Sequence, residues 1–226
     1  MHTTGAKIFT VILLVICATG LPAQDASARD SDSPATDREG PNRVSYSADR
    51  PAATPLAHVG AWEFSLWSRE AIGNSAYGDV GDAYMSVAGF RTGYVFARPV
   101  IHDRVRGSVE YFFDIVPVFV LTKPGVVYGG GLSPVGFKWN FLNRRQSYVA
   151  FSGGGIFSKR NLPPGNTSSF NFTISADAGL SLWSNARQSL GAGAGFWHLS
   201  NATLGGSNPS LNCVQFFVEY HWYKPK

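Results

Sequence analysis

Residues 168–183, which read SSFNFTISADAGLSLW, decide the fold. Every even position from Phe170 to Leu182 holds an apolar side chain, while the odd positions between them hold polar residues or glycine. Successive side chains of a β-strand point to opposite faces, so this period of two predicts one long strand with one apolar face. Globular strands usually have about five or six residues. A strand as long as this one matches a tilted crossing of a lipid bilayer.

The same period recurs from His58 to Tyr223 and predicts eight strands. They are expected at about 58–68, 83–96, 104–116, 126–141, 147–157, 168–183, 188–200 and 211–223. In the fourth strand we expect five apolar side chains on one face, namely Val127, Val135, Phe137, Trp139 and Phe141. Short connections, at 142–146 and 184–187, are expected at one end of the strands and long ones, at 69–82 and 158–168, at the other, as in transmembrane barrels.

These patterns predict an all-β fold, an eight-stranded antiparallel transmembrane β-barrel of the bacterial outer membrane. Its apolar faces would point outward to lipid. The alternative is a soluble, lipocalin-like barrel, in which the apolar faces would point inward.

The residues before the first strand are expected to lie outside the barrel. Residues 1–28 combine Lys7, an apolar run at 8–17 and a small-residue cleavage region, which is typical of a secretory signal peptide. Residues 29–57 are polar and predict a disordered periplasmic segment, and residues 58–226 form the barrel. Signal cleavage would leave Cys213 as the only cysteine, so no disulfide within the chain is expected.

Composition narrows the class of partner. The chain of 226 residues carries a formal charge of +4, which suits an anionic partner such as lipid phosphate. It contains no nucleic-acid-binding motif, and its histidines lack the spacing of metal ligands. We therefore expect a membrane partner, with no nucleic acid, no cofactor and no metal.

A pair of polar residues ends the seventh predicted strand. His198 and Ser200 continue its lipid-facing positions, and two strand residues span roughly 6–7 Å, so the imidazole can reach the hydroxyl. A base within reach of a hydroxyl is what an activated serine nucleophile needs. Asn212 begins the eighth strand on the same face. Polar side chains on a lipid-facing wall are energetically unfavourable, which indicates a function for them, and binding of a lipid substrate would be such a function.

The run His198-Leu199-Ser200-Asn201-Ala202, followed by Asn208-Pro209, resembles the outer-membrane lipid A 3-O-deacylases, the PagL-type family. Segments 110–117 and 128–134 are also similar to barrel strands of that family. The resemblance implies hydrolysis, without a metal, of the ester-linked acyl chain at position 3 of lipid A. The partner would be the lipopolysaccharide of the outer leaflet.

The resemblance also implies roles for single residues. Ser200 would be the nucleophile and His198 the general base. Asn201 and the backbone near Thr203 would stabilise the oxyanion, and Asn208 would shape the loop. The chain departs from the family at Asn212, where known members carry a glutamate that orients the histidine. The second hypothesis is a non-catalytic barrel of the same fold with a structural or binding role, and the sequence leaves open whether the chain forms a homodimer.

Overall fold

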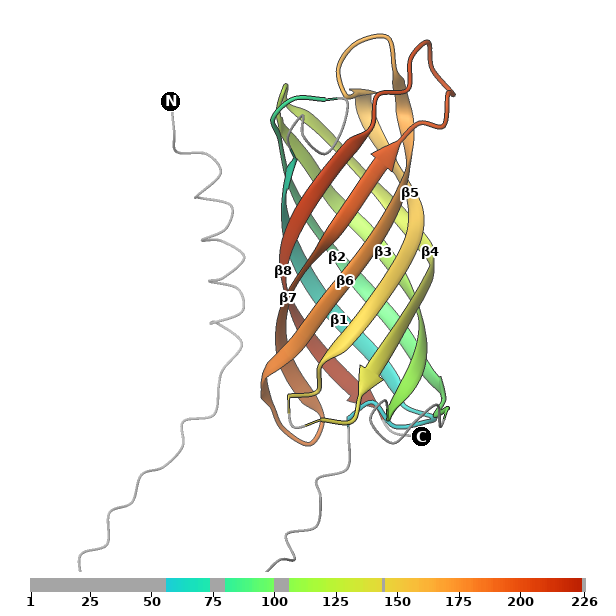
Figure 1. The fold of residues 1–226 in the computed structure, drawn as a ribbon, viewed down its shortest axis with the longest axis vertical. Helices are drawn as coiled ribbons and strands as arrows, with labels where there is room; N and C mark the ends of the chain where they lie inside the picture. The colour runs from blue at the N-terminus through green and yellow to red at the C-terminus, as the bar shows by residue number, and fades with distance from the viewer. Residues whose placement is uncertain (1–55, 74–79, 100–105, 144, 225–226) are drawn as a thin grey trace, which may run out of the picture. The chain divides into compact units, whose positions relative to one another are not determined.

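The computed structural model describes residues 56–73, 80–99, 106–143 and 145–224, and within them eight strands form a closed barrel (Figure 1). The strands are β1 (Trp62–Gly73), β2 (Ala83–Ala97), β3 (Gly107–Lys123), β4 (Val127–Phe141), β5 (Tyr148–Leu162), β6 (Ser168–Ser184), β7 (Gln188–Ser200) and β8 (Leu211–Lys224). Each strand pairs antiparallel with the next, and β8 pairs back with β1. The predicted eight-stranded antiparallel barrel is confirmed. No helix in the described ranges is long and apolar enough to span a membrane.

Five strands, β2, β4, β6, β7 and β8, lie within one residue of their predicted ends, while β1, β3 and β5 differ. Strand β1 begins at Trp62 because Gly60 has φ +91° and Ala61 N–H donates to the His58 carbonyl, which makes a turn. It then continues past the predicted end at 68, since Arg69 points into the barrel and pairs with Asp177. Because the inner face of this barrel is polar, a charged side chain such as that of Arg69 can lie within a strand and does not mark its end.

The outer face of the barrel is apolar and the inner face carries the charges. Exposed apolar side chains line the outside, among them Trp62, Phe64, Leu66, Phe90, Phe151, Ile174 and Phe216. The same strands bury charged side chains inside, among them Glu63, Arg91, Glu110, Lys138 and Glu219. A soluble barrel has the opposite arrangement, so the lipocalin-like alternative is wrong.

Two bulges at prolines change which positions face outward. In β3, Pro117 and Val118 are both exposed, and the pairing with β4 jumps from Val116 to Phe119. In β4, Pro134 and Val135 are both exposed at a similar break in the pairing with β5. Proline has no N–H for the ladder and is tolerated at bulges, where one strand gains an unpaired residue.

The bulges correct one prediction and explain another. Val127 was expected on the outer face with Phe137, but it is buried inside the barrel, because the bulge near Pro134 reverses the alternation between them. Strand β3 was expected to end at 116, yet it continues to Lys123 beyond the bulge at Pro117. The predicted long connection at 158–168 is shortened to residues 163–167, since β5 runs on to Leu162 and β6 begins at Ser168.

The interior is filled differently toward its two ends. We call the end where Trp62 pairs with Lys224 the terminal end, and the opposite end the loop end. Toward the terminal end, Lys138 Nζ lies 2.5 Å from a Glu63 oxygen and 3.1 Å from a Glu110 oxygen. Toward the loop end an apolar cluster takes over, with Met85, Phe119, Leu121, Val127, Ile156, Leu162, Leu199 and Leu211 among its members. Buried charges are tolerated when each has a partner.

The chain enters the barrel before the predicted boundary at 58. Leu56 is buried, and the Ser108 hydroxyl donates to the Ala57 carbonyl at 2.7 Å. The predicted signal peptide and the predicted polar segment as far as residue 55 lie outside the described residues.

Candidate functional site

Strands β7 and β8 bring the predicted site residues together at the loop end. His198 and Asn212 are direct cross-strand partners, and Ser200 follows His198 by two positions on the same face. All three side chains are half-buried on the outside of the wall, while their neighbours Leu199 and Leu211 point inside. The sequence pattern predicted this shared face.

A chain of hydrogen bonds joins the three side chains. His198 Nδ1 lies 2.6 Å from Asn212 Oδ1, and His198 Nε2 lies 3.0 Å from Ser200 Oγ. The amide oxygen only accepts, so Nδ1 must carry the hydrogen and Nε2 is left as an acceptor for the Ser200 hydroxyl. Asn212 Nδ2 lies 3.5 Å from Ser210 Oγ, which favours this orientation of the amide. The arrangement can activate a serine hydroxyl by general-base catalysis.

Apolar side chains border this polar chain. Phe172 is the partner of Ser200 on β6, and Ile174 is the partner of His198. Both are exposed, Phe172 at 44% and Ile174 at 61%. The hydroxyl of Ser200 therefore lies beside surface that suits hydrocarbon, at the boundary between the wall and loop 201–210.

The remaining predicted site residues hold loop 201–210 in shape. Asn201 is 1% exposed, its N–H donates to Asn208 Oδ1 at 2.9 Å, and its side-chain amide donates to the Ser207 carbonyl at 2.8 Å. Thr203 N–H donates to Asn201 Oδ1 at 2.9 Å. Ala202 and Thr203 have positive φ values of 49° and 66°, which turn the chain sharply after Asn201. The two groups expected at the oxyanion are thus bonded within the loop itself.

No carboxylate takes the place of Asn212 among the residues that the structure describes near His198. Glu219 lies further along β8 and points inward, where it accepts a hydrogen bond from the Tyr148 hydroxyl. In the described ranges, no group of three His, Cys, Asp or Glu side chains is placed to hold a metal ion.

Sequence reasoning missed Ser207 and Asn166. Ser207 donates to the Asn166 carbonyl from both its N–H and its hydroxyl, each at 2.8 Å. The two residues lie in different loops, and no periodicity relates one loop to another. The only local signal was the pair Gly205-Gly206, which permits a close approach of two backbones.

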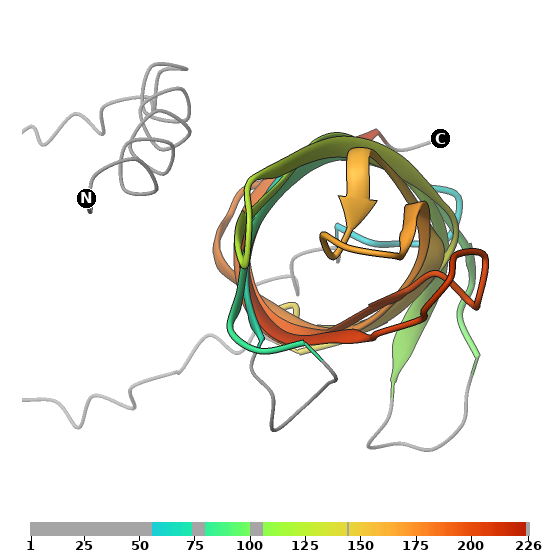
Figure 2. The ribbon, with the colours of Figure 1, turned by 90° about the horizontal axis from the view of Figure 1, so that it is seen from above.

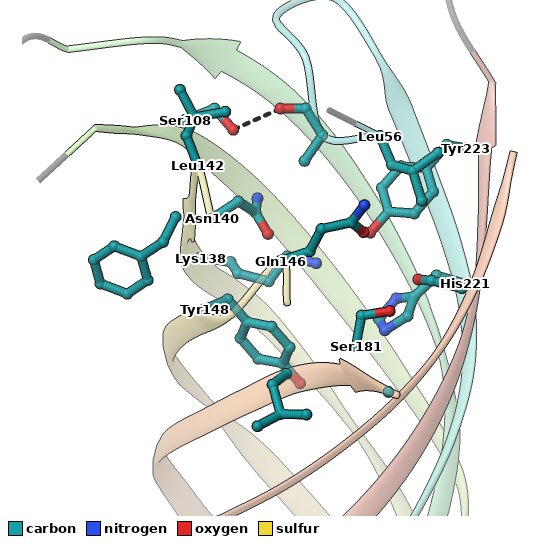
Figure 3. A pocket seen from close by; sticks show the side chains of 15 residues that line it. Leu56, Ser108, Lys138, Asn140, Leu142, Gln146, Tyr148, Ser181, His221 and Tyr223 are labelled. Atoms are coloured by element: carbon teal, nitrogen blue, oxygen red, sulfur yellow. Dashed lines mark hydrogen bonds between the residues drawn. The ribbon is translucent and has the colours of Figure 1, made fainter. Parts of the chain in front are cut away.

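A cavity lined by both polar and apolar side chains lies inside the barrel at the terminal end, away from Ser200 (Figure 3). It is lined by Leu56, Gln146, Tyr148, His221 and Tyr223, among others, and its volume of about 30 Å³ suits about one or two water molecules. Neither His198 nor Asn212 lines it. The hydrogen-bonded chain on the outer wall is therefore the stronger candidate for a site.

Comparison with known proteins gives a family match and a match to a solved structure. The family model for lipid A 3-O-deacylase (PagL) matches residues 57–221, a span that includes His198, Ser200 and Asn212. No curated protein matched the chain. Among solved structures, a crystal structure of the outer membrane enzyme PagL matches with a TM-score of 0.47 and 17% sequence identity, covering 68% of this chain and 97% of that one.

Proposed function

The chain belongs to the lipid A 3-O-deacylase (PagL) family, and from this membership we propose that it is an outer-membrane esterase acting on lipid A. The bond hydrolysed is the ester of the acyl chain at position 3. The observation that carries the proposal is the chain Asn212–His198–Ser200, with contacts of 2.6 Å and 3.0 Å, on a wall that faces lipid. A nucleophile on an outer wall reaches a substrate that is itself a membrane lipid.

The first half of the reaction transfers the acyl group to Ser200. Its Oγ attacks the ester carbonyl carbon while His198 Nε2 takes the hydroxyl proton. When the tetrahedral intermediate collapses, the bond to the sugar oxygen breaks and His198 returns the proton to that oxygen. A water molecule then attacks the acyl-enzyme with His198 again as base, which releases the fatty acid and restores Ser200.

The oxyanion needs donors that the loop supplies. Asn201 Nδ2 carries two hydrogens, of which one is donated to Ser207. The Thr203 N–H donates to Asn201 Oδ1, so its use in the transition state requires this bond to be exchanged. Catalytic hydrogen bonds often form fully only with substrate present. Asn208 supports both groups by holding the Asn201 backbone.

Lipid A of the outer leaflet fits the place of the site. Loop 201–210 lies at the loop end of the barrel, opposite the terminal end where β1 begins and β8 finishes. The loop end faces the outside of the cell when the terminal end is periplasmic. All three residues of the hydrogen-bonded chain come from adjacent strands of one barrel. One copy of the chain therefore supplies the whole catalytic set, and no homodimer is needed for it.

The neutral amide of Asn212 favours a second candidate, a non-catalytic barrel that binds lipid A without cleaving it. An amide orients the imidazole but cannot stabilise its protonated form by charge. Mass spectrometry of lipid A from cells with and without the protein separates the two candidates. Loss of one acyl chain only in cells that contain the protein supports the esterase.

The Ser200→Ala variant tests the nucleophile. We expect acyl release to fall to background, because the attacking oxygen is gone, while the barrel still folds, since the hydroxyl makes a single hydrogen bond on the outer wall. Ser169→Ala is the matched control, because Ser169 is exposed and its hydroxyl makes no hydrogen bond within the described structure. Deacylation at the parent rate by the Ser200 variant, measured at equal amounts of folded protein, contradicts the mechanism.

A further inference from the structure

Ser200 is the last residue of β7, and the β7–β8 ladder does not reach it. The final pair of that ladder is Leu199 with Leu211, whereas on the other side Ser200 still pairs with Phe172 of β6. The backbone of Ser200 is thus held by a neighbouring strand on one side only. On the β8 side, loop 201–210 must hold it.

Loop 201–210 rests on the hairpin formed by β5 and β6. The turn of this hairpin, residues 163–167, lies over the mouth of the barrel when the molecule is viewed from above (Figure 2). Its base is anchored, because Leu162 is fully buried in the apolar cluster and Thr167 donates from its hydroxyl to the Pro163 carbonyl at 2.5 Å. The hairpin is therefore a fixed support for the adjacent loop.

Three successive contacts lead from the hairpin to the nucleophile. The Asn166 carbonyl accepts two hydrogen bonds from Ser207, from its N–H and its Oγ, each at 2.8 Å. The Ser207 carbonyl accepts from Asn201 Nδ2 at 2.8 Å. Asn201 is bonded covalently to Ser200 and is 1% exposed.

We propose that the β5–β6 hairpin positions the nucleophile through the relay Asn166–Ser207–Asn201, with Ser207 as a positioning residue. The inference rests on the proposed esterase function and adds to it the turn of the hairpin whose strand β6 lies beside β7. The hairpin supplies the support that β8 does not give.

Two glycines make the contact between loop and hairpin close enough for the relay. A Cβ added at Gly205 would lie 2.6 Å from the Thr167 carbonyl carbon and 2.7 Å from its oxygen. A Cβ at Gly206 would collide with the Asn166 side-chain amide. The Thr167 backbone is anchored, whereas the Asn166 side chain can rotate away. A methyl group at 205 must therefore separate loop from hairpin, while one at 206 need not.

The test compares four variants with the parent on detergent-solubilised lipid A. Ser207→Ala removes one of the two bonds to Asn166, and we expect kcat to fall roughly fivefold with KM unchanged. Ser207→Thr keeps the hydroxyl and should restore the parent kcat. For Gly205→Ala we expect a fall in kcat on the order of a hundredfold, as for a displaced catalytic group. Ser169→Ala, in the same hairpin, should match the parent.

A second readout does not depend on lipid A. A fluorophosphonate probe reacts with an activated serine, so its rate of labelling at Ser200 reports how well the hydroxyl is positioned. We expect the labelling rates to follow the order of the kcat values, at equal folded fractions on unheated gels. Parent-like kcat and labelling in both Ser207→Ala and Gly205→Ala would overturn the relay and leave the esterase intact.

The remaining outcomes separate the two proposals. A parent that labels at Ser200 but leaves lipid A intact overturns the proposed substrate, and the relay is then judged on labelling alone. A parent that neither labels nor deacylates overturns both, because there is then no activated nucleophile to position.

Discussion

The side-chain amide of Asn212 is the residue-scale feature that most affects the chemistry. It accepts a hydrogen bond from His198 at 2.6 Å, which is already the geometry of a working pair. What it lacks is a negative charge to stabilise the imidazolium formed during attack. In a serine protease, exchanging the aspartate that holds the catalytic histidine for asparagine lowers kcat about 10⁴-fold.

The Asn212→Asp variant tests this feature, because it changes the charge without changing the shape. We expect deacylation to rise by roughly tenfold, equivalent to about 1.4 kcal/mol of transition-state stabilisation. The gain should be smaller for Asn212→Glu, whose extra methylene displaces the carboxylate from the present 2.6 Å contact. The same exchange in a Ser200→Ala background is the control and should give no activity. An active parent with a slower Asp variant would show that the amide is the better partner in this site.

The sequence allowed the shared position of the three central candidate residues to be predicted, but not the support around them. His198, Ser200 and Asn212 share a face because strands alternate with a fixed period, and Asn212 faces His198 because β7 and β8 are consecutive. The contact between Ser207 and Asn166 joins two loops whose approach depends on how far β5 and β6 extend. Neither the alternation of side chains along a strand nor a sequence motif predicts how closely these two loops approach each other.

At the scale of elements, regular alternation predicted most strands and failed where the backbone departs from it. Strand β7 was predicted with its true ends, because Gln188–Ser200 contains no bulge in its pairing with β8. The third predicted strand instead stops just before Pro117, and the fourth runs through Pro134 without a break. In the barrel both lie at bulges, where a missing N–H is harmless.

Neighbouring residues at the start of β4 test the bulge. Val127 is 2% exposed and points inward, whereas Tyr128 is 57% exposed. Val127→Lys would place an unpaired charge in the apolar cluster, at a cost of about 3–5 kcal/mol, and should reduce the folded fraction. Tyr128→Lys should fold normally, since a charge near the membrane interface costs only about 0–1 kcal/mol. The stability of both variants is measured by unfolding in urea, with the folded fraction read from the band shift on unheated gels. A Tyr128→Lys variant less stable than Val127→Lys would contradict the inward direction of Val127 and the outward direction of Tyr128.

At the scale of the whole molecule, the paired charges inside the barrel and the hydrogen-bonded chain Asn212–His198–Ser200 outside it are separate systems. Lys138 contacts Glu63 and Glu110 toward the terminal end, while Ser200 lies at the loop end. Lys138→Met should therefore lower stability by about 3–5 kcal/mol, because two buried carboxylates lose the cation that they share. Deacylation per folded molecule should stay at the parent value. Lys159→Met, at an exposed position of β5, is the control and should change neither quantity.

The distribution of polar and apolar surface also predicts where the protein is found. With an apolar outer wall and a charged interior, the folded chain should sediment with outer membranes and migrate faster on unheated than on heated gels. The measurement is fractionation of cells followed by both kinds of gel. Recovery of the folded chain in the soluble periplasmic fraction after gentle lysis would exclude a membrane barrel.

The outward direction of Ser200 has a consequence for kinetics. An enzyme with an enclosed cleft takes up its substrate from the bulk solution. Here the Ser200 hydroxyl, the proposed nucleophile, lies on an outer wall bordered by Phe172 and Ile174. Encounter then takes place by lateral diffusion within a leaflet, and the quantity that sets the rate is the number of substrate molecules per unit area. Diluting the suspension leaves this surface density unchanged, whereas adding inert lipid or detergent lowers it. Turnover should therefore follow the mole fraction of substrate in the bilayer or micelle and not its bulk concentration.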